Sequence, residues 1–275
     1  MAPTAQAAQD TTVDSILLRE DIDGIAYLTL NRPKQRNSLS EGLMKALTAE
    51  MKAIETDTSV RVVVLGANGP GFCAGHDLKE MTDGRDANDS GRSYFERILK
   101  ICSTMMLTIM QSPKPVIARV HGIATAAGCQ LVATCDLAIA SDDAQFATPG
   151  VNIGLFCSTP MVALSRNVNR KHAMEMLLTG DMIDAARASE MGLINKAVPT
   201  AELDQTVQGL ATKIASKSTV PLTIGKRAYY EQLEMGISDA YVYASEAMVK
   251  NILTRDAEEG VGAFIEKRAP KWEDR

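Results

Sequence analysis

The sequence has little of what marks proteins that bind nucleic acids or membranes. Lys and Arg number 29 against 34 Asp and Glu, which gives a formal net charge of −5. An acidic chain has no general basic field to attract polyanions. No apolar run approaches the ~20 residues that a membrane-spanning helix needs. We therefore expect no nucleic-acid partner and no membrane insertion.

Cysteine and histidine are scarce and lack the spacings of metal or redox sites. The five cysteines are odd in number and form no CxxC pair, and the three histidines are scattered. Such cysteines fit buried thiols in a reducing compartment. The nucleotide-binding patterns GxGxxG and GxxxxGK[ST] are absent as well. We expect neither a metal nor a separate cofactor.

The first 14 residues have no features of a folded segment or a leader. They are small and polar, and lack both the basic-then-apolar order of a secretion signal and the arginines of a transit peptide. We interpret residues 1–14 as a frayed tail and expect a cytoplasmic protein.

Short apolar runs alternate with helical patterns over the following part of the chain. Strands are predicted at residues 25–30, 60–65, 115–120, 137–140 and 194–198. A helix capped by Ser40 and a helix over 129–135 fall between them, and the end of the chain is mainly helical. The pattern predicts one α/β domain over 15–200 with a helical C-terminal region over 201–275.

Two loops rich in small residues each follow a predicted buried strand. They cover residues 71–78 and 121–128. Small residues let the backbone approach a ligand closely, and the second loop opens a helix whose N–H groups favour negative charge. If the loops converge, they form an oxyanion hole. The alternative is that both are ordinary turns.

Several segments together resemble the enoyl-CoA hydratase/isomerase (crotonase) superfamily. The segments are NRPKQRNSLS (31–40), GFCAGHDLKEM (71–81), HGIATAAGCQLVATCDLAIAS (121–141), AQFATPGVNIGLFCS (144–158), EMLLTGDMIDAARASEMGLINKAVP (175–199) and GVGAFIEKR (260–268). The resemblance spans residues 16–272. It implies a spiral of repeated ββα turns and a helical C-terminal region that assembles a homo-oligomer, either a trimer or a dimer of trimers. It also implies an acyl-CoA thioester as substrate, with coenzyme A as part of that substrate, and a place in fatty-acid metabolism.

The resemblance also implies roles for individual residues. The backbone N–H groups of His76 and Ala127 match the pair that holds the thioester oxygen, although relatives usually have glycine where Ala127 stands. The His76 side chain is either a pocket lining or a base. The substrate-binding positions implied in this way are Lys34, Ala74, His76, Asp77, Leu78, Ala127, Gly128, Cys157, Ser158 and Lys267.

The chain departs from the resemblance at the acid and base. Hydratases of this family use two glutamates, and the matching positions hold Gln130 and Gly150. Glutamine cannot carry a proton near neutral pH, and glycine offers only space. The usual hydration mechanism is therefore not expected. If the pocket is otherwise intact, glutamate at both positions is predicted to create hydratase activity.

Other roles remain open at the sequence level. Ser158 matches the position of an aspartate nucleophile in dehalogenases, and Cys157 precedes it, but a nucleophile needs an activating base. Asp136 is expected to be a structural carboxylate. A decarboxylase or thioesterase needs fewer side-chain acids than a hydratase. The alternative from another class is a non-catalytic oligomer that binds acyl-CoA.

Overall fold

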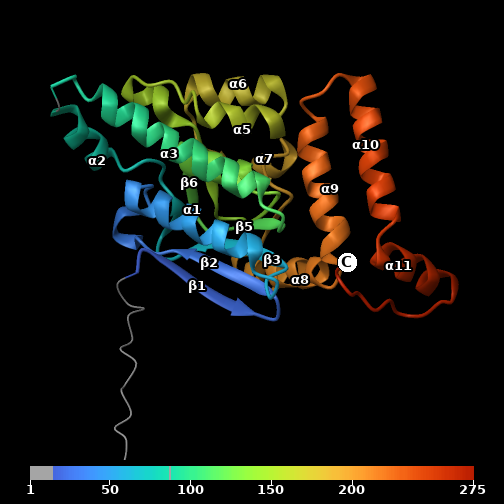
Figure 1. The fold of residues 1–275 in the computed structure, drawn as a ribbon. Helices are drawn as coiled ribbons and strands as arrows, with labels where there is room; N and C mark the ends of the chain where they lie inside the picture. Colours follow the sequence, from blue (N-terminus) through green and yellow to red (C-terminus); the bar gives the residue numbers. More distant parts are fainter. Residues whose placement is uncertain (1–14, 87) are drawn as a thin grey trace, which may run out of the picture.

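The computed structural model describes residues 15–86 and 88–275 (Figure 1). The predicted tail, residues 1–14, lies outside the described part. The described chain forms two sheets and a set of helices, and the helices at the C-terminal end extend away from the sheets (Figure 1).

The larger sheet has six strands in the order β1-β2-β3-β5-β7-β10. All neighbours after β2 are parallel, and β1 pairs antiparallel with β2. The predicted runs become strands, with ends shifted by one or two residues. We did not predict β1, because charges interrupt its apolar residues and its last three residues are exposed. The bounds are β1 Leu17–Ile22, β2 Ile25–Leu30, β3 Val62–Ala67, β5 Val116–Val120, β7 Leu137–Ser141 and β10 Lys196–Val198.

The smaller sheet explains how the chain repeats its turns. Its strands are short and run in the order β4-β6-β8-β9. The chain passes from β3 to β4, from β5 to β6 and from β7 to β8, and each of these pairs is followed by a helical segment. This is the predicted spiral of ββα turns. The bounds are β4 Gly71–Cys73, β6 Ile123–Thr125, β8 Gln145–Ala147 and β9 Ile183–Asp184.

Helices cover both faces of the larger sheet. Side chains of β3 alternate between two apolar clusters, so that Val63 and Leu65 pack in one and Val62 and Val64 in the other. The first cluster includes α1, α3 and α4, and the second includes α8. A strand buried on both faces needs the continuous apolar run seen in the sequence. The α-helices are α1 Glu41–Thr56, α2 Leu78–Asp83, α3 Arg92–Gln111, α4 Ala127–Thr134, α5 Pro160–Asn167, α6 Arg170–Thr179, α7 Ala185–Glu190, α8 Leu203–Ala215, α9 Thr219–Gln232, α10 Ile237–Ile252 and α11 Arg255–Ile265. Short 3-10 helices lie at η1 Pro33–Gln35, η2 Gly84–Asp86, η3 Pro149–Ile153 and η4 Thr200–Glu202.

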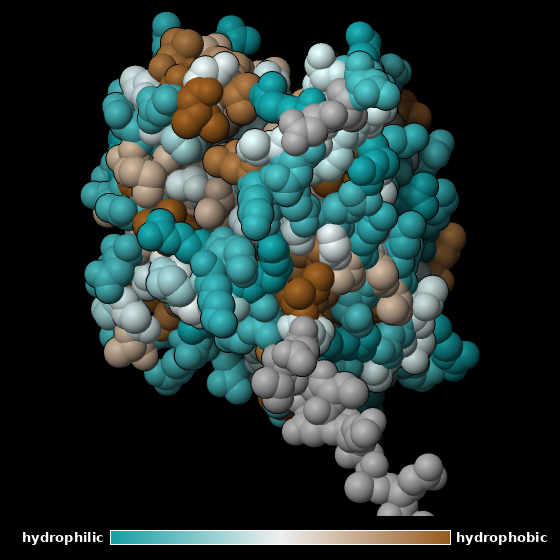
Figure 2. Space-filling model, turned by 90° about the vertical axis from the view of Figure 1, so that its left-hand side faces the viewer, coloured by the Kyte–Doolittle hydropathy of each residue, from teal (hydrophilic) through white to brown (hydrophobic). Residues whose placement is uncertain are grey.

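The last two helices leave many apolar side chains in solvent. By contrast, the face that carries α2 and the start of α3 is mostly hydrophilic, with small apolar patches (Figure 2). None of the helices described is long and apolar enough to cross a membrane. The exposed apolar residues of α10 and its C-cap are Ile237, Tyr241, Val242, Met248, Val249, Ile252 and Leu253, and those of α11 are Val261, Phe264 and Ile265.

Candidate functional site

The two predicted loops leave neighbouring strands at the same edge of the smaller sheet. Strand β4 pairs in parallel with β6, with Gly71 opposite Ile123 and Cys73 opposite Ala124. The chain then continues from each strand into one of the loops. A hydrogen bond of 3.1 Å from Thr125 Oγ1 to the Ala74 oxygen joins them at this edge. The strand pairing thus brings together the two loops whose convergence the sequence left open.

The His76 N–H is turned away from the protein's own acceptors by its neighbours. Leu39 N donates to the Gly75 oxygen at 2.7 Å, and Asp77 N donates to the Leu39 oxygen at 3.1 Å. A trans peptide points its C=O and its N–H in opposite directions. Because the Gly75 oxygen faces Leu39, the His76 N–H of the same peptide faces the other way. It donates to no acceptor among the described residues.

The Ala127 N–H is free for a different reason. Ala127 is the first residue of α4, and the first N–H groups of a helix have no partner within the helix. No other described residue accepts a hydrogen bond from it. The sequence placed this helix at 129–135, but it begins two residues earlier, with one residue between it and the end of β6. The unusual backbone lies at Ala126, with φ of 50°, so Ala127 accommodates its Cβ atom within the helix.

Glycines bring the two loops into contact. A Cβ atom on Gly75 would lie 3.3 Å from Ala127 N and 2.9 Å from the Cβ atom of Ala126. Gly75 also has φ of +91°, which disfavours any side chain. A Cβ atom on Gly128 would lie 2.0 Å from the Cys73 oxygen. The two free N–H groups therefore belong to segments in van der Waals contact.

His76 in the first loop and Gln130 on α4 each have a buried polar atom without a hydrogen-bond partner. Gln130, on α4, is 6% exposed, and its Oε1 has no hydrogen-bond partner. The Nε2 atom of His76 is also buried and unpartnered. Burial lowers the pKa of His76, so its imidazole is neutral near pH 7. An unpaired buried polar atom costs about 1–3 kcal/mol, which favours a bound molecule with complementary groups.

The position of the second missing glutamate is closed. A Cβ atom on Gly150 would lie 2.7 Å from the Leu155 oxygen and 2.9 Å from Cys157 Sγ. The expectation that glycine leaves space at this position is therefore wrong, because the 155–157 segment fills it. A glutamate side chain here requires that segment to move.

The Asp77 carboxylate and the nearby Glu80 already have partners. Asp77 caps α2 by accepting hydrogen bonds from Lys79 N and Glu80 N, and it pairs with Arg32 at 2.9 Å. Glu80 accepts a hydrogen bond from Glu41 N at the start of α1. A substrate-binding role for Asp77 stays a prediction. The ion pair between Asp77 and Arg32 was not predicted from the sequence, although Arg32 lies in the NRPKQRNSLS motif.

The two candidate nucleophiles show no activating base. Burial raises the pKa of the Cys157 thiol. The Ser158 hydroxyl is exposed and donates to the Phe156 oxygen at 3.3 Å. Among the described residues neither side chain forms a hydrogen bond to a base, and no group of three or more metal-binding side chains occurs. In the described structure Cys157 therefore contributes packing and Ser158 contributes surface. Neither is activated as a nucleophile.

The remaining predicted binding residues lie on the surface. Lys34, in η1, is exposed, and Leu78, which opens α2, is 55% exposed. Lys267 is exposed just beyond α11, which lies at the opposite side of the molecule from α2 (Figure 1). Within one chain the structure therefore separates Lys267 from the 71–78 loop.

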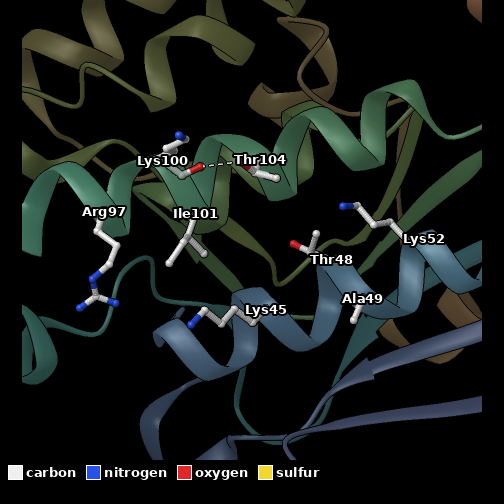
Figure 3. A pocket seen from close by; sticks show the side chains of 8 residues that line it. All are labelled: Lys45, Thr48, Ala49, Lys52, Arg97, Lys100, Ile101 and Thr104. Atoms are coloured by element: carbon white, nitrogen blue, oxygen red, sulfur yellow. Dashed lines mark hydrogen bonds between the residues drawn. The ribbon is translucent and has the colours of Figure 1, made fainter.

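A groove of about 400 Å³ between α1 and α3 contains none of the predicted site residues (Figure 3). It has a basic lining, but Lys45 and Arg97 both pair with Glu41. Two of its four cations are therefore neutralised within the chain. Its lining residues are Lys45, Thr48, Ala49, Lys52, Arg97, Lys100, Ile101 and Thr104.

The sequence matches a known protein family over most of its length. The family model described as "Enoyl-CoA hydratase/isomerase" matches residues 20–275. Enoyl-CoA hydratase domain-containing protein 3, mitochondrial, of Homo sapiens is 47% identical over 91% of this chain and 81% of that protein. Its crystal structure has a TM-score of 0.89 at 46% identity, covering 94% of this chain and 100% of the other. A crystal structure of enoyl-CoA hydratase from Mycobacterium smegmatis has a TM-score of 0.90 at 50% identity, covering 94% and 99%.

These likenesses extend over almost the whole described chain. The mitochondrial designation belongs to the relative, and the cytoplasmic location of this chain stays a prediction. The fold expected from the resemblance is confirmed by the structural neighbours. The chain is a member of the enoyl-CoA hydratase/isomerase family.

Proposed function

We propose that the protein binds an acyl-CoA thioester with the carbonyl oxygen between the N–H groups of His76 and Ala127. The observation that carries the proposal is that both groups are unpaired and belong to loops in contact. An enolate or a tetrahedral adduct places negative charge on that oxygen. Fixed donors stabilise such charge, and each donor contributes about 2.7–4 kcal/mol in known oxyanion holes.

The residues around these donors limit the chemistry. Gln130 has no proton to give, and the closed position of Gly150 holds no carboxylate. Hydration by two glutamates is therefore not proposed. Loss of carbon dioxide from a β-carboxyl acyl thioester fits better, because the breaking carbon–carbon bond supplies the electron pair of the enolate. Solvent water then supplies the proton that converts the enolate to the product thioester. Thioester hydrolysis fits as a second reaction, and either belongs to fatty-acid metabolism.

Gln130 and Gly150 also support the non-catalytic alternative. A site that has lost its proton carriers and filled one of their positions still retains its donors. Such a protein holds an acyl-CoA thioester without converting it. Binding does not distinguish the two proposals, but turnover does.

A homo-oligomer is part of the proposal. The apolar side chains of α10 and α11 include Leu253, 80% exposed, and Phe264, 85% exposed. Large exposed apolar surfaces mark interaction sites. A second copy of the chain on this surface also provides a route for Lys267 to reach the coenzyme A phosphates of a neighbouring site, with Lys34 as the cation of the same chain.

The experiment is mass spectrometry of enoyl-, malonyl- and saturated acyl-CoA thioesters incubated with the protein. Gain of water, loss of carbon dioxide or release of free coenzyme A identifies the reaction. Ala127→Pro is the test variant, because proline removes the N–H at the first position of α4. Ala126 before it has φ of 50° and ψ of −119°, which a following proline disfavours, so the fold of the variant is checked by circular dichroism. Ala127→Gly retains the N–H as the control.

The outcomes separate the proposals. We expect Ala127→Pro to lower turnover by about 100- to 1,000-fold and to weaken binding, and Ala127→Gly to preserve both. Unchanged masses with measurable binding establish the non-catalytic alternative. Absence of binding by the wild-type protein overturns the proposal as a whole.

A further inference from the structure

We infer that Arg32 is a positioning residue that orients and polarises the His76 N–H through two peptide groups in series. This inference rests on the proposed function of that N–H. Arg32 lies 44 positions before His76 in the sequence, so its effect depends on how the fold brings segments together.

The series begins at the guanidinium group. Arg32 Nη1 donates to the Ser38 oxygen at 2.6 Å. That oxygen belongs to the same peptide group as Leu39 N, which donates to the Gly75 oxygen at 2.7 Å. The Gly75 oxygen in turn shares its peptide group with the His76 N–H. Each peptide is planar, so fixing one end fixes the other.

A cation at the start of this series of hydrogen bonds also polarises the peptide groups in it. Hydrogen bonds in series polarise one another, with estimates of about 10–30% per bond. The positive charge of Arg32 draws electron density from the Ser38 oxygen. This makes Leu39 N a stronger donor, and the Gly75 oxygen then makes His76 N a stronger donor. The ligand oxygen is the acceptor at the end of the chain.

The guanidinium is itself held firmly. Arg32 Nη2 donates to Asp77 Oδ2 at 2.9 Å, and the two side chains are 17% and 12% exposed. The Asp77 pKa stays below its ordinary value: burial acts to raise it, but hydrogen bonds from Arg32 and Glu80 N outweigh burial. The charged Asp77 carboxylate thus fixes the Arg32 guanidinium through Nη2, while Nη1 donates to the Ser38 oxygen.

The main chain of Arg32 is fixed by Asn37. Arg32 N donates to Asn37 Oδ1 at 2.8 Å, and Asn37 Nδ2 donates to the Asn68 and Gly71 oxygens. Asn37 is fully buried with φ of 54°. Asparagine adopts this left-handed conformation more readily than most residues. The segment 32–39 is therefore tied to the strand that leads into the His76 loop.

The test measures the carbonyl stretch of a saturated acyl-CoA labelled with carbon-13 at the thioester carbonyl, bound to the full-length protein. A hydrogen bond lowers this frequency relative to free thioester. We expect Arg32→Met to reduce the shift by about 10–30% and Arg32→Lys to recover part of it. Arg92→Met, which removes an exposed arginine paired with Glu96, is the control and leaves the shift unchanged. A wild-type shift in folded Arg32→Met overturns the inference.

A second measurement separates this inference from the proposed function. The proton chemical shift of the His76 amide in ligand-free protein reports the polarisation directly. We expect Arg32→Met to move it upfield and Arg32→Lys to lie between. If Arg32→Met does not fold, Arg32→Lys carries the test, because lysine keeps the charge but loses the planar fork. An unchanged amide shift overturns the inference even if the thioester binds, whereas a wild-type protein that binds no thioester overturns the proposed function alone.

Discussion

The main-chain oxygen of Leu155 lies 2.7 Å from the position that a Cβ atom on Gly150 would occupy. Cys157 Sγ closes the same position at 2.9 Å. The glycine is therefore part of a packed corner in which the chain itself replaces a side chain.

Substitution of Gly150 is expected to destabilise the protein. Gly150→Ala forces the Leu155 oxygen to move, and overpacking of this kind costs about 1–3 kcal/mol. Gln130→Glu combined with Gly150→Glu is expected to produce no hydratase activity, which reverses the sequence prediction. Urea unfolding and hydration of an enoyl-CoA measure the two effects.

Gly209 provides the matched control for this prediction. It lies within α8, and a Cβ atom there meets no atom within 4 Å. Gly209→Ala is expected to stabilise the protein by about 0.5–1 kcal/mol, because alanine favours a helix.

Hydratase activity in the double glutamate variant, with unchanged stability, would show that the 155–157 segment yields easily and that the corner is not closed.

The stability of the protein is expected to depend on the protonation of His76. Burial lowers its pKa from the ordinary 6.5. Below about pH 6.5 the unfolded chain takes up a proton that the folded chain resists. The contribution of neutral His76 is therefore present above this pH and is lost as the pH falls through the folded pKa.

His76→Gln removes the titratable imidazole and retains the main-chain N–H. Between about pH 7 and pH 5, we expect the unfolding free energy of the wild type to fall more than that of the variant. Urea titrations at several pH values provide the comparison. Parallel curves for the two proteins would contradict the burial of a neutral imidazole.

Asp136 is expected to be a structural residue that holds α9 against the larger sheet. Its carboxylate pairs with Lys226 Nζ at 2.7 Å and accepts hydrogen bonds from Val116 N and Tyr230 Oη. Removing one partner of a buried ion pair costs about 3–5 kcal/mol. Asp136→Asn is expected to lower the unfolding free energy by this amount.

The exposed pair of Arg92 and Glu96 is the control for that measurement. Its side chains are 81% and 66% exposed, and Glu96→Gln is expected to change stability by less than about 0.5 kcal/mol. Equal effects in the two variants would show that the Asp136 pair is solvated.

The thiols are expected to be unreactive in the folded protein. Burial raises the pKa of Cys73, Cys102 and Cys129 to about 12, so their thiolates are scarce near pH 8. A colourless thiol reagent that becomes coloured on reaction should react slowly with native protein and with all five cysteines after unfolding. A thiol that reacts rapidly in the folded protein would contradict this expectation. If that thiol is Cys157, its role as a nucleophile is supported.

The sequence predicted the larger sheet well and the smaller sheet poorly. Strands such as Val62–Ala67 are apolar on both faces and are visible as runs of valine and leucine. Strands such as Ile123–Thr125 have three residues within small-residue loops and show no periodicity. Their positions depend on pairing with segments far away in the chain.

The candidate site shows the same division. The glycines of the two loops predicted close approach of the backbone to a ligand, which stays a prediction. The structure brings the loops themselves together, since a Cβ atom on Gly75 would lie 3.3 Å from Ala127 N. The roles of Arg32 and Leu39 depend on which peptide groups they meet, and one sequence gives no signal for that. The closed position at Gly150 was missed because glycine in a sequence does not reveal what fills the space beside it.

The proposed oxyanion hole is tested most directly by a crystal structure of the protein with a saturated acyl-CoA bound. We expect the thioester oxygen to lie about 2.7–3.1 Å from both His76 N and Ala127 N. We also expect the 155–157 segment to remain in place against Gly150. A thioester oxygen that contacts neither N–H group would contradict the proposed site.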